Sequence, residues 1–421
     1  MSIAASLKAS GVAEVLVVLR SGQAPSKTAL ATGAAAVLRH FSTSPYSQDA
    51  ALLEVLQARE LDDREAFRGV LPSATRLSVT SSYAGPRHYP NLGLVLGNVD
   101  RGALSALRKE CDVEQIVPAP QLRLIRPVAK AETVLQPGYS WGLRSLQIDQ
   151  LHVEGLTGKD VLIGHLDTGV DAAHPALEGA VQSFAEFDSL GNYVDGSTPR
   201  DSADHGTHTA GTLAGREVNG IRFGVAPGGK LASAMVIEGG KQLARILGGM
   251  DWIVGQGARV LNMSLGLVGV DEALRAISRI LRTRGVLPVF AIGNDAPGRS
   301  RYPGNYAEVL SVGAADNLGR VAEFSSSQLF KRAQDPIGPD LVGPGVDVLS
   351  CVPGGYVQMS GTSMATPHIA GLAALLMEAR PDKTCDEIEA AIFRSCSLLP
   401  GMLVNRANRG YPNAVRALNL L

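Results

Sequence analysis

Short apolar runs, separated by longer runs of mixed character, restrict the fold of this chain more than any other feature. The apolar runs lie at residues 161–166, 231–237, 259–264, 287–292 and 309–313, and runs of helical length at 243–252 and 271–284 fall between them. The apolar runs do not alternate with polar residues, which is typical of strands buried on both faces. The pattern predicts an α/β fold with a doubly wound, mostly parallel sheet, whose site lies at the carboxyl ends of the strands.

The first 120 residues follow a different pattern. We expect strands at 14–19, 76–82, 92–99 and 113–117 and helices at 49–68 and 103–109, the second of them capped by Asp100. This order predicts a small ferredoxin-like α+β domain. Prolines 118, 120, 127 and 137 then interrupt any regular element. We therefore divide the chain into a domain at 1–120, a linker at 121–137 and a second domain at 138–421.

Composition excludes several classes of protein. Hydrophobic residues make up 45% of the 421 residues and charged residues 19%, so the chain can bury a large core. The net charge of -1 provides no basic surface for nucleic acid or an anionic membrane. No apolar run reaches the roughly 18 residues that a membrane span needs. We expect neither nucleic acid nor a membrane as a partner.

Location and thiol chemistry follow from two smaller observations. The apolar run at 15–19 is too short for a signal-peptide core, so a cytoplasmic location is the default expectation and unconventional secretion the alternative. The four cysteines lack metal-ligand spacing and are too few for a disulfide framework. We expect reduced thiols, with a Cys385–Cys396 pair as the alternative in an oxidising compartment.

Ser363 is the first candidate for chemistry. It lies in the motif Ser-Gly-Thr-Ser-Met-Ala-Thr-Pro-His at 360–368, directly before an apolar helical run at 369–377. A hydroxyl at a helix N-terminus lies where unpaired N–H groups stabilise negative charge, which favours a nucleophile. The alternative from this motif alone is a helix cap without chemistry.

Asp167 ends the first apolar run of the second domain, in an Asp-Thr-Gly motif. A carboxylate there can orient an imidazole, and a simple turn is the alternative. An aspartic-protease dyad needs a second Asp-Thr-Gly or Asp-Ser-Gly motif, and the sequence contains none. The aspartic-protease interpretation therefore fails.

His205 and His208 lie three residues apart in a run rich in small residues. A zinc site of the His-Glu-x-x-His type is disfavoured because the glutamate is missing and the spacing is one residue short. We therefore interpret His205 as a general base and His208 as structural. Asn294 follows a buried strand and Gly293, where it either forms a turn or directs its side-chain N–H toward an oxyanion.

Taken together, these motifs resemble those of a known family. Asp-Thr-Gly at 167–169, His-Gly-Thr-His-Thr-Ala-Gly-Thr at 205–212 and Gly-Thr-Ser-Met-Ala-Thr-Pro-His at 361–368 are similar to the three signatures of subtilisin-like (subtilase) serine proteases. Segments 224–227, 262–266, 302–303 and 344–346 also resemble the family, in the same order. The resemblance covers the chain from Trp141 to its end.

The resemblance implies a serine endopeptidase. Ser363 would attack the peptide carbonyl, His205 would transfer the proton, Asp167 would hold the imidazole, and Asn294 would help to form the oxyanion hole. The N-terminal domain resembles the family's propeptide, which implies a self-inhibited proenzyme with two partners, a polypeptide substrate and its own prodomain. The competing hypothesis is a catalytically silent scaffold of the same fold that binds peptides.

The resemblance also implies how the substrate is held. Ser264, Leu265 and Gly266 would form an edge to which an extended peptide adds as a strand. Gly239 and Gly240 would line the opposite side, Gly293 lies beside the catalytic asparagine, and Arg301 near the primary pocket suggests a preference for an acidic residue before the cut. We further expect residues 121–125 in the cleft, with a processing cut between Leu122 and Gln136.

No cofactor is required for this chemistry. Many family members carry a calcium loop in the place of residues 215–221, but Val218 stands about where an asparagine ligand is usual. Calcium needs several oxygen ligands, so structural calcium at this loop is doubtful and no metal-binding residue is assigned.

Overall fold

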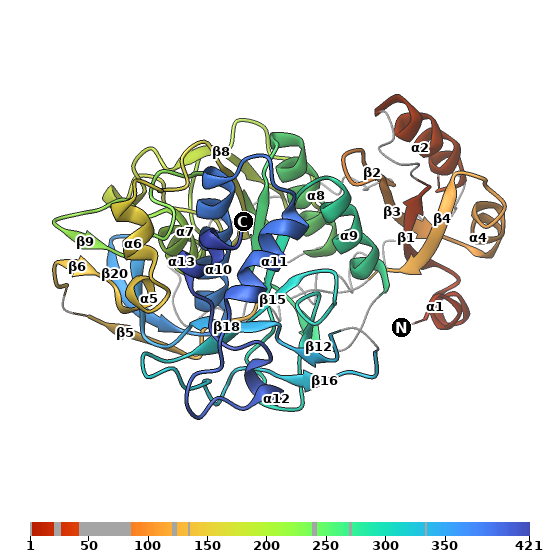
Figure 1. Ribbon diagram of the computed structural model, residues 1–421. Coiled ribbons are helices and arrows are strands. Elements are labelled where there is room, and N and C mark those ends of the chain that lie inside the picture. Colours follow the sequence, from red (N-terminus) through yellow and green to blue (C-terminus); the bar gives the residue numbers. More distant parts are fainter. Residues whose placement is uncertain are drawn as a thin grey trace. The chain divides into compact units, whose positions relative to one another are not determined.

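The computed structural model describes residues 2–20, 27–41, 86–119, 124–133, 135–237, 242–268, 272–332 and 335–421. Two compact units account for the chain (Figure 1). The N-terminal unit comprises Met1–Gln121 together with Asp188–Asn192 and Glu238–Asp251. The main unit comprises Leu122–Phe187, Tyr193–Ile237 and Trp252–Leu421.

The N-terminal unit contains an antiparallel sheet of strand order β2-β3-β1-β4. Its elements are α1 (Ile3–Ser10), β1 (Ala13–Leu19), α2 (Lys27–Phe41), β2 (Arg87–Tyr89), β3 (Leu94–Val99), α4 (Arg101–Leu107) and β4 (Val113–Pro118). Alternate residues of β1, Val15, Val17 and Leu19, lie in one core with residues from α2 and α4, as the two-residue period of a strand requires. This strand order is the ferredoxin-like one that the sequence predicts.

The capping prediction for α4 is also confirmed, because the side chain of Asp100 accepts a hydrogen bond from the backbone N–H of Ala103 at 2.8 Å. The helix expected at 49–68 and the strand expected at 76–82 lie outside the described residues. The sequence pattern did not predict α2.

The main unit contains a seven-stranded sheet of order β18-β15-β13-β11-β7-β10-β8, and every neighbouring pair is parallel. Its strands are β7 (Leu162–Asp167), β8 (Val181–Glu186), β10 (Lys230–Met235), β11 (Val260–Met263), β13 (Leu287–Ala291), β15 (Leu310–Ala315) and β18 (Leu341–Pro344). The predicted parallel, doubly wound architecture is therefore confirmed. The strand order reverses between β7 and β11, which is where sheets of this kind place their sites.

Helix α10 (Thr362–Ala379) is the central helix of the main unit. Every residue from Thr362 to Met377 is buried, as expected for a helix that is apolar around its whole circumference. It contacts α7 (His205–Ala214) and strands β11, β13, β15 and β18, and Figure 1 shows α7 and α10 side by side. The other described α-helices that lie wholly in the main unit are α5 (Trp141–Ser145), α6 (Ile148–Val153), α9 (Glu272–Thr283), α11 (Cys385–Ser395), α12 (Val404–Ala407) and α13 (Ala414–Asn419), and α8 (Gln242–Gln256) begins in the N-terminal unit and ends in the main unit.

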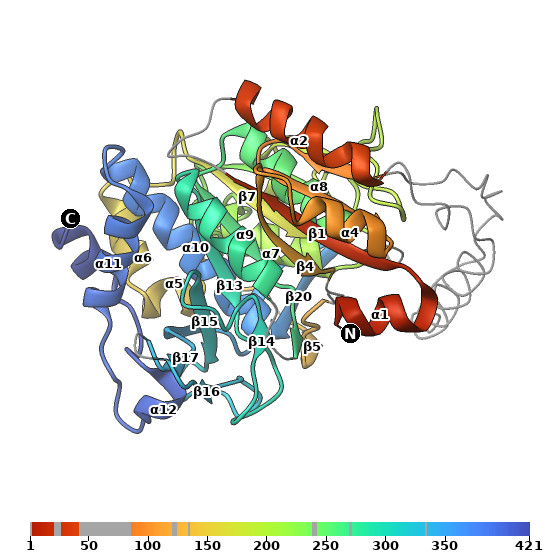
Figure 2. The same cartoon turned by 90° about the vertical axis from the view of Figure 1, so that its right-hand side faces the viewer.

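The linker contains a strand that the sequence did not predict. β5 (Ala129–Glu132) pairs antiparallel with β20 (Gly355–Ser360), which in turn pairs with β19 (Val348–Val352), as Figure 2 shows for β5 and β20. All four residues of β5 are exposed, so no hydrophobic period marks the strand. Its pairing depends on backbone groups, which a sequence pattern does not report.

Short two-stranded pairs complete the main unit. They are β6 (Gly138–Tyr139) with β9 (Ile221–Arg222), β12 (Leu267–Val268) with β14 (Arg301–Tyr302), and β16 (Gln328–Leu329) with β17 (Ile337–Gly338). Within the described part of the chain, no helix has the length and apolar character needed to cross a bilayer.

Candidate active site

The four candidate residues lie at element ends of the main unit. Asp167 is the last residue of β7, His205 is the first residue of α7, Asn294 follows β13, and Ser363 is the second residue of α10. The strands of a parallel sheet end at one edge, so β7 and β13 present their polar residues on the side where α7 and α10 begin.

Asp167 and His205 form a buried pair. The Nδ1 atom of His205 lies 2.7 Å from Oδ1 of Asp167, and neither side chain is more than 4% exposed. Burial alone would raise the pKa of Asp167, but the charge and hydrogen bond of His205 hold it below its usual value. Burial alone would lower the pKa of His205, but the carboxylate raises it above 6.5. The pair therefore favours an imidazole that accepts a proton.

Asp201 fixes the start of α7 against the end of β7. One oxygen of Asp201 accepts the hydroxyl of Thr168 at 2.7 Å, and the other accepts the N–H and the hydroxyl of Thr207 at 2.7 and 2.6 Å. A side chain on Gly206 would overlap the carbonyl oxygen of Gly169, so the close approach of helix and strand requires glycine. The sequence pattern gave no signal for Asp201, because it lies in an irregular polar stretch.

Ser363 is fully buried and contacts the chain's own linker. Its hydroxyl donates to the carbonyl oxygen of Ile125 at 2.8 Å. Among the described residues, Nε2 of His205 makes no hydrogen bond, so the imidazole nitrogen that would take the serine proton has no partner. The Ser363 hydroxyl, which would donate to this nitrogen in the reaction, donates to the linker instead.

The linker runs along the edge that follows β11. Leu124 forms an antiparallel bridge with Leu265, and the N–H of Ile125 donates to the carbonyl oxygen of Ser264 at 3.1 Å. The side chain of Ile125 is 1% exposed and lies near Gly266. Beyond the serine, the N–H of Val128 donates to the carbonyl oxygen of Ser360 at 2.8 Å, and β5 follows.

Asn294 is oriented by the residue before the serine. Its Oδ1 accepts the N–H and the hydroxyl of Thr362 at 2.9 and 2.8 Å, which turns the amide nitrogen toward the linker. That nitrogen donates to the carbonyl oxygen of Arg126 at 2.8 Å. A Cβ on Gly361 would lie 3.3 Å from both this nitrogen and the Ser363 hydroxyl, so glycine keeps the two groups close together.

Comparison of the sequence with known proteins identifies one family. The model of the Subtilase family matches residues 158–415. The chain belongs to the subtilase family. The M-protease of Shouchella clausii (strain KSM-K16) is 36% identical over 274 residues, which cover 64% of this chain and 67% of that protein. Subtilisin Savinase of Lederbergia lenta is 38% identical over 245 residues, 57% of this chain and 85% of that protein, and subtilisin E of Bacillus subtilis (strain 168) is 34% identical over 270 residues, 62% and 66%.

The structure describes only some of the remaining substrate-binding candidates of this subtilase. Gly239 and Gly240 lie outside the described residues. Gly293 has a φ of +115°, a conformation that favours glycine, and a Cβ there would lie 3.0 Å from Cγ of Arg301.

Arg301 has a carboxylate partner within the chain. Its Nε and NH2 groups donate to the two oxygens of Asp295 at 2.6 and 2.8 Å. This bidentate pair gives the guanidinium of Arg301 a carboxylate partner within the chain. Arg301 therefore gives no reason to expect an acidic residue in the substrate. No sequence pattern marks Asp295 as the partner of Arg301, because the two residues meet through a loop rather than through a regular period.

The second histidine of the subtilase motif has a backbone partner. Nε2 of His208 lies 3.0 Å from the carbonyl oxygen of Val348, and burial lowers the pKa of His208 to about 3. Among the described residues, no group of three or more His, Cys, Asp and Glu side chains is placed to hold a metal ion.

In the loop at residues 215–221, a valine stands at position 218, about where many subtilases have an asparagine that binds calcium. Val218 has no side-chain oxygen, and the carboxylate of Glu217 is paired with Arg222 at 2.5 Å. The N–H and carbonyl groups of Val218 and Ile221 bond to each other at 3.0 and 3.2 Å, which closes the turn.

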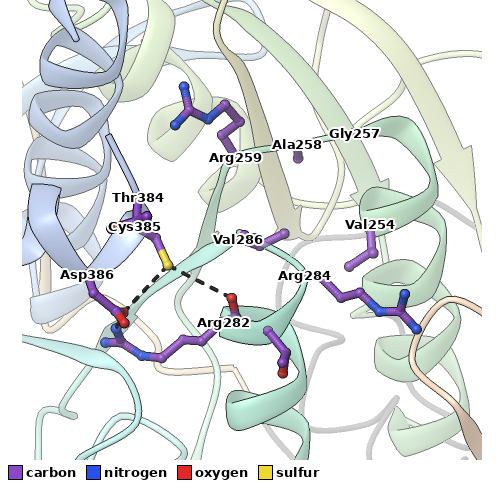
Figure 3. Close-up of a pocket in the computed structure, with 12 residues that line it drawn as sticks. Val254, Gly257, Ala258, Arg259, Arg282, Arg284, Val286, Thr384, Cys385 and Asp386 are labelled. Carbon is purple, nitrogen blue, oxygen red and sulfur yellow. Dashed lines mark hydrogen bonds and ion pairs between the residues drawn. The ribbon is translucent and has the colours of Figure 1, made fainter. Parts of the chain in front are cut away.

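A separate pocket of about 540 Å³ lies between the ends of α8, α9 and α11 (Figure 3). Arg259 in its wall donates to the carbonyl oxygens of Pro381 and Lys383, and Arg282 pairs with Asp386. The lining includes none of the four candidate residues. The pocket therefore does not form part of the site described above.

Proposed function

We propose that this subtilase, a serine endopeptidase, hydrolyses peptide bonds through Ser363, His205 and Asp167. Ser363 Oγ attacks the carbonyl carbon while His205 Nε2 accepts its proton, and Asp167 holds the imidazole through Nδ1. Asn294 donates to the oxyanion that forms. His205 then returns the proton to the leaving amine, and water releases the acyl group by the same steps in reverse. Nothing favours the silent peptide-binding scaffold, because all four groups are present.

One observation carries this proposal. The linker contacts Ser363 as a substrate would, with the carbonyl oxygen of Ile125 at 2.8 Å from the Ser363 hydroxyl, and α7, which begins with His205, packs against α10. The backbone pairing of Leu124 and Ile125 with the strand edge supports β-augmentation as the mode of substrate binding.

The protein is made as a self-inhibited precursor whose first substrate is its own linker. The cut follows Ile125, because the Ile125 N–H is paired with Ser264 and its side chain is buried near Gly266. Before the cut, Ser363 donates to the carbonyl of Ile125 while Asn294 donates to that of Arg126. Because the two groups contact different carbonyls, the precursor is held short of the reacting geometry.

Intact-mass analysis of the purified full-length protein tests this proposal. The wild-type chain should yield a fragment that begins at Arg126, and Ser363→Ala should remain uncut. Ile125→Asp should slow the cut, because a charge would be buried, whereas the matched variant Ile125→Leu should be processed normally. A wild-type chain that remains uncut, like Ser363→Ala, would contradict the catalytic proposal. A fragment that begins at Pro127 would contradict only the position of the cut.

A further inference from the structure

A third buried histidine lies directly behind the catalytic carboxylate. His165 belongs to β7, two residues before Asp167, so the two side chains point to the same face of the sheet. His165 is fully buried in a strand whose neighbouring residues are apolar, where an aliphatic side chain would meet no desolvation cost.

His165 bridges two hydroxyl groups. Its Nδ1 lies 2.9 Å from the hydroxyl of Ser233 in β10, and its Nε2 lies 2.9 Å from the hydroxyl of Thr209 in α7. The same Thr209 hydroxyl lies 3.0 Å from Oδ2 of Asp167, the carboxylate oxygen that faces away from His205. A continuous chain of polar contacts therefore joins Ser233 to the catalytic pair.

One assignment of protons satisfies every member of this chain. The Ser233 hydroxyl donates to Nδ1 of His165, the Nε2–H of His165 donates to the Thr209 oxygen, and the Thr209 hydroxyl donates to Asp167. In the opposite tautomer, Nε2 would accept the only proton of Thr209, and Asp167 would then face an oxygen lone pair. The imidazole is neutral in either case, because burial lowers the pKa of His165 to about 4.

The Thr209 hydroxyl also has two competing acceptors. The carbonyl oxygens of His205 and Gly206 lie 3.2 and 3.1 Å away, and a threonine within a helix commonly donates to such carbonyls. A hydrogen bond donated by His165 occupies one lone pair of the Thr209 oxygen and restricts the rotation of its hydroxyl. The carboxylate then receives the proton because it is the charged acceptor.

We infer that His165, together with Ser233, is a positioning residue for the hydrolytic reaction, and that it acts by holding the Thr209 hydroxyl on Oδ2 of Asp167. This inference rests on the proposed function of the Asp167–His205 pair. The hydrogen bond fixes the carboxylate plane and draws charge away from Oδ1, the oxygen that faces His205. The other titratable groups around the pair are Asp201 and Asp204, before α7, and His208 within it.

Thr209→Val tests the relay with little change of shape, and Thr209→Ser is its matched control. The processed enzyme is assayed with a peptide substrate per active site, counted by fluorophosphonate titration. In Thr209→Val we expect kcat to fall about 3- to 10-fold with KM unchanged, which corresponds to one hydrogen bond. The acidic limb of kcat/KM should move to higher pH, because more charge on Oδ1 binds protonated His205 more tightly. Thr209→Ser should restore both values.

A second variant approaches the relay from the other end. His165→Val with Ser233→Ala replaces both partners by apolar groups, so no buried hydroxyl is left unpaired. It should lower kcat and shift the pH limb in the same direction as Thr209→Val, and adding Thr209→Val should cost little more. His165→Gln should lower kcat less than this double variant does, because its amide can still donate to Thr209.

The outcomes separate the relay from the proposed function. An active wild type whose Thr209→Val variant keeps the wild-type kcat and pH profile overturns the relay and leaves the catalytic assignment intact. An inactive, uncut wild type overturns both. If the His165–Ser233 variant fails to fold, the comparison of Thr209→Val with Thr209→Ser decides alone. Equal losses of kcat in those two variants, without a pH shift, also contradict the relay.

Discussion

At the scale of single residues, the site depends on a few polar atoms whose partners fix their orientation. Oδ1 of Asp167 contacts His205 and the N–H of Thr168, both at 2.7 Å. The side-chain oxygen of Asn294 accepts a hydrogen bond from Thr362, and its nitrogen donates one to the linker. These contacts fix orientation before any substrate arrives, which is what electrostatic stabilisation of a transition state requires.

The first prediction concerns pH. His205 must be neutral to accept the serine proton, and its pKa lies above 6.5 because the nearby carboxylate outweighs burial. Activity should therefore be complete above that raised pKa and be lost as the pH falls through it. The measurement is kcat/KM of the processed enzyme between about pH 5 and 9. An acidic limb centred below pH 6 would contradict the prediction.

The second prediction concerns Asn294. Replacing it by alanine removes the side-chain donor and leaves Thr362 without its acceptor, so kcat should fall while KM changes little. Loss of the equivalent donor costs about 10²–10³-fold in subtilisin itself, and a loss of that order is expected here. Asn294→Gln is the control for side-chain polarity. A variant with normal kcat would remove Asn294 from the mechanism.

At the scale of elements, the linker strand is the least expected part of the main unit. β5 has no buried side chain, yet it extends the β19–β20 pair and continues from the residues that cross Ser363. Lys130 in β5 also pairs with Asp204, directly before α7. Main-chain hydrogen bonds, rather than side-chain burial, therefore hold this segment.

The third prediction tests whether main-chain hydrogen bonds keep the linker in place. Val128 is 48% exposed, so its contribution comes from the N–H that donates to Ser360. In the uncut Ser363→Ala background, Val128→Pro removes this donor, and added trypsin should cleave after Lys130 faster than in the parent. Val128→Ala keeps the N–H and should be cleaved at the parent rate. Mass spectrometry of timed samples measures both rates.

At the scale of the whole molecule, the N-terminal unit includes segments that lie far apart in the sequence. Oδ1 of Asp251 accepts the N–H groups of Asn91 and Leu92 at 2.7 and 2.9 Å, and Oδ2 accepts the amide of Asn91 at 3.1 Å. One carboxylate thus pairs with a turn about 160 residues earlier in the chain.

The fourth prediction follows from that carboxylate. Asp251→Ala in the Ser363→Ala background leaves two backbone N–H groups without their acceptor and should lower the stability of the N-terminal unit by about 2–4 kcal/mol. Asp251→Asn, which keeps one acceptor, should lose less. Urea unfolding followed by hydrogen exchange of residues 94–99 measures the change, and an unchanged midpoint would contradict it.

Much of this architecture could be predicted from the sequence because it depends on local patterns. Uninterrupted apolar runs mark strands buried on both faces, and the polar residues that end them therefore mark the site. Strand β5 could not be predicted, because its side chains face solvent and no hydrophobic period marks it. The sequence also did not predict the Arg301–Asp295 pair or the contacts of Asp201 with Thr168 and Thr207. Loop geometry, which no sequence pattern reports, brings these residues to their partners. His165 did carry a signal, a polar residue at i−2 from a strand-end carboxylate inside an apolar run.

The pairing of β5 with β20 has a consequence for the permanence of the proposed cut. After cleavage at Ile125, the new amine of Arg126 remains tethered beside Ser363, at an effective concentration on the order of millimolar or higher. That amine competes with water for the acyl-enzyme, so the bond can be resealed as well as broken. Departure of the released fragment, residues 1–125, rather than the chemical step, then makes activation irreversible.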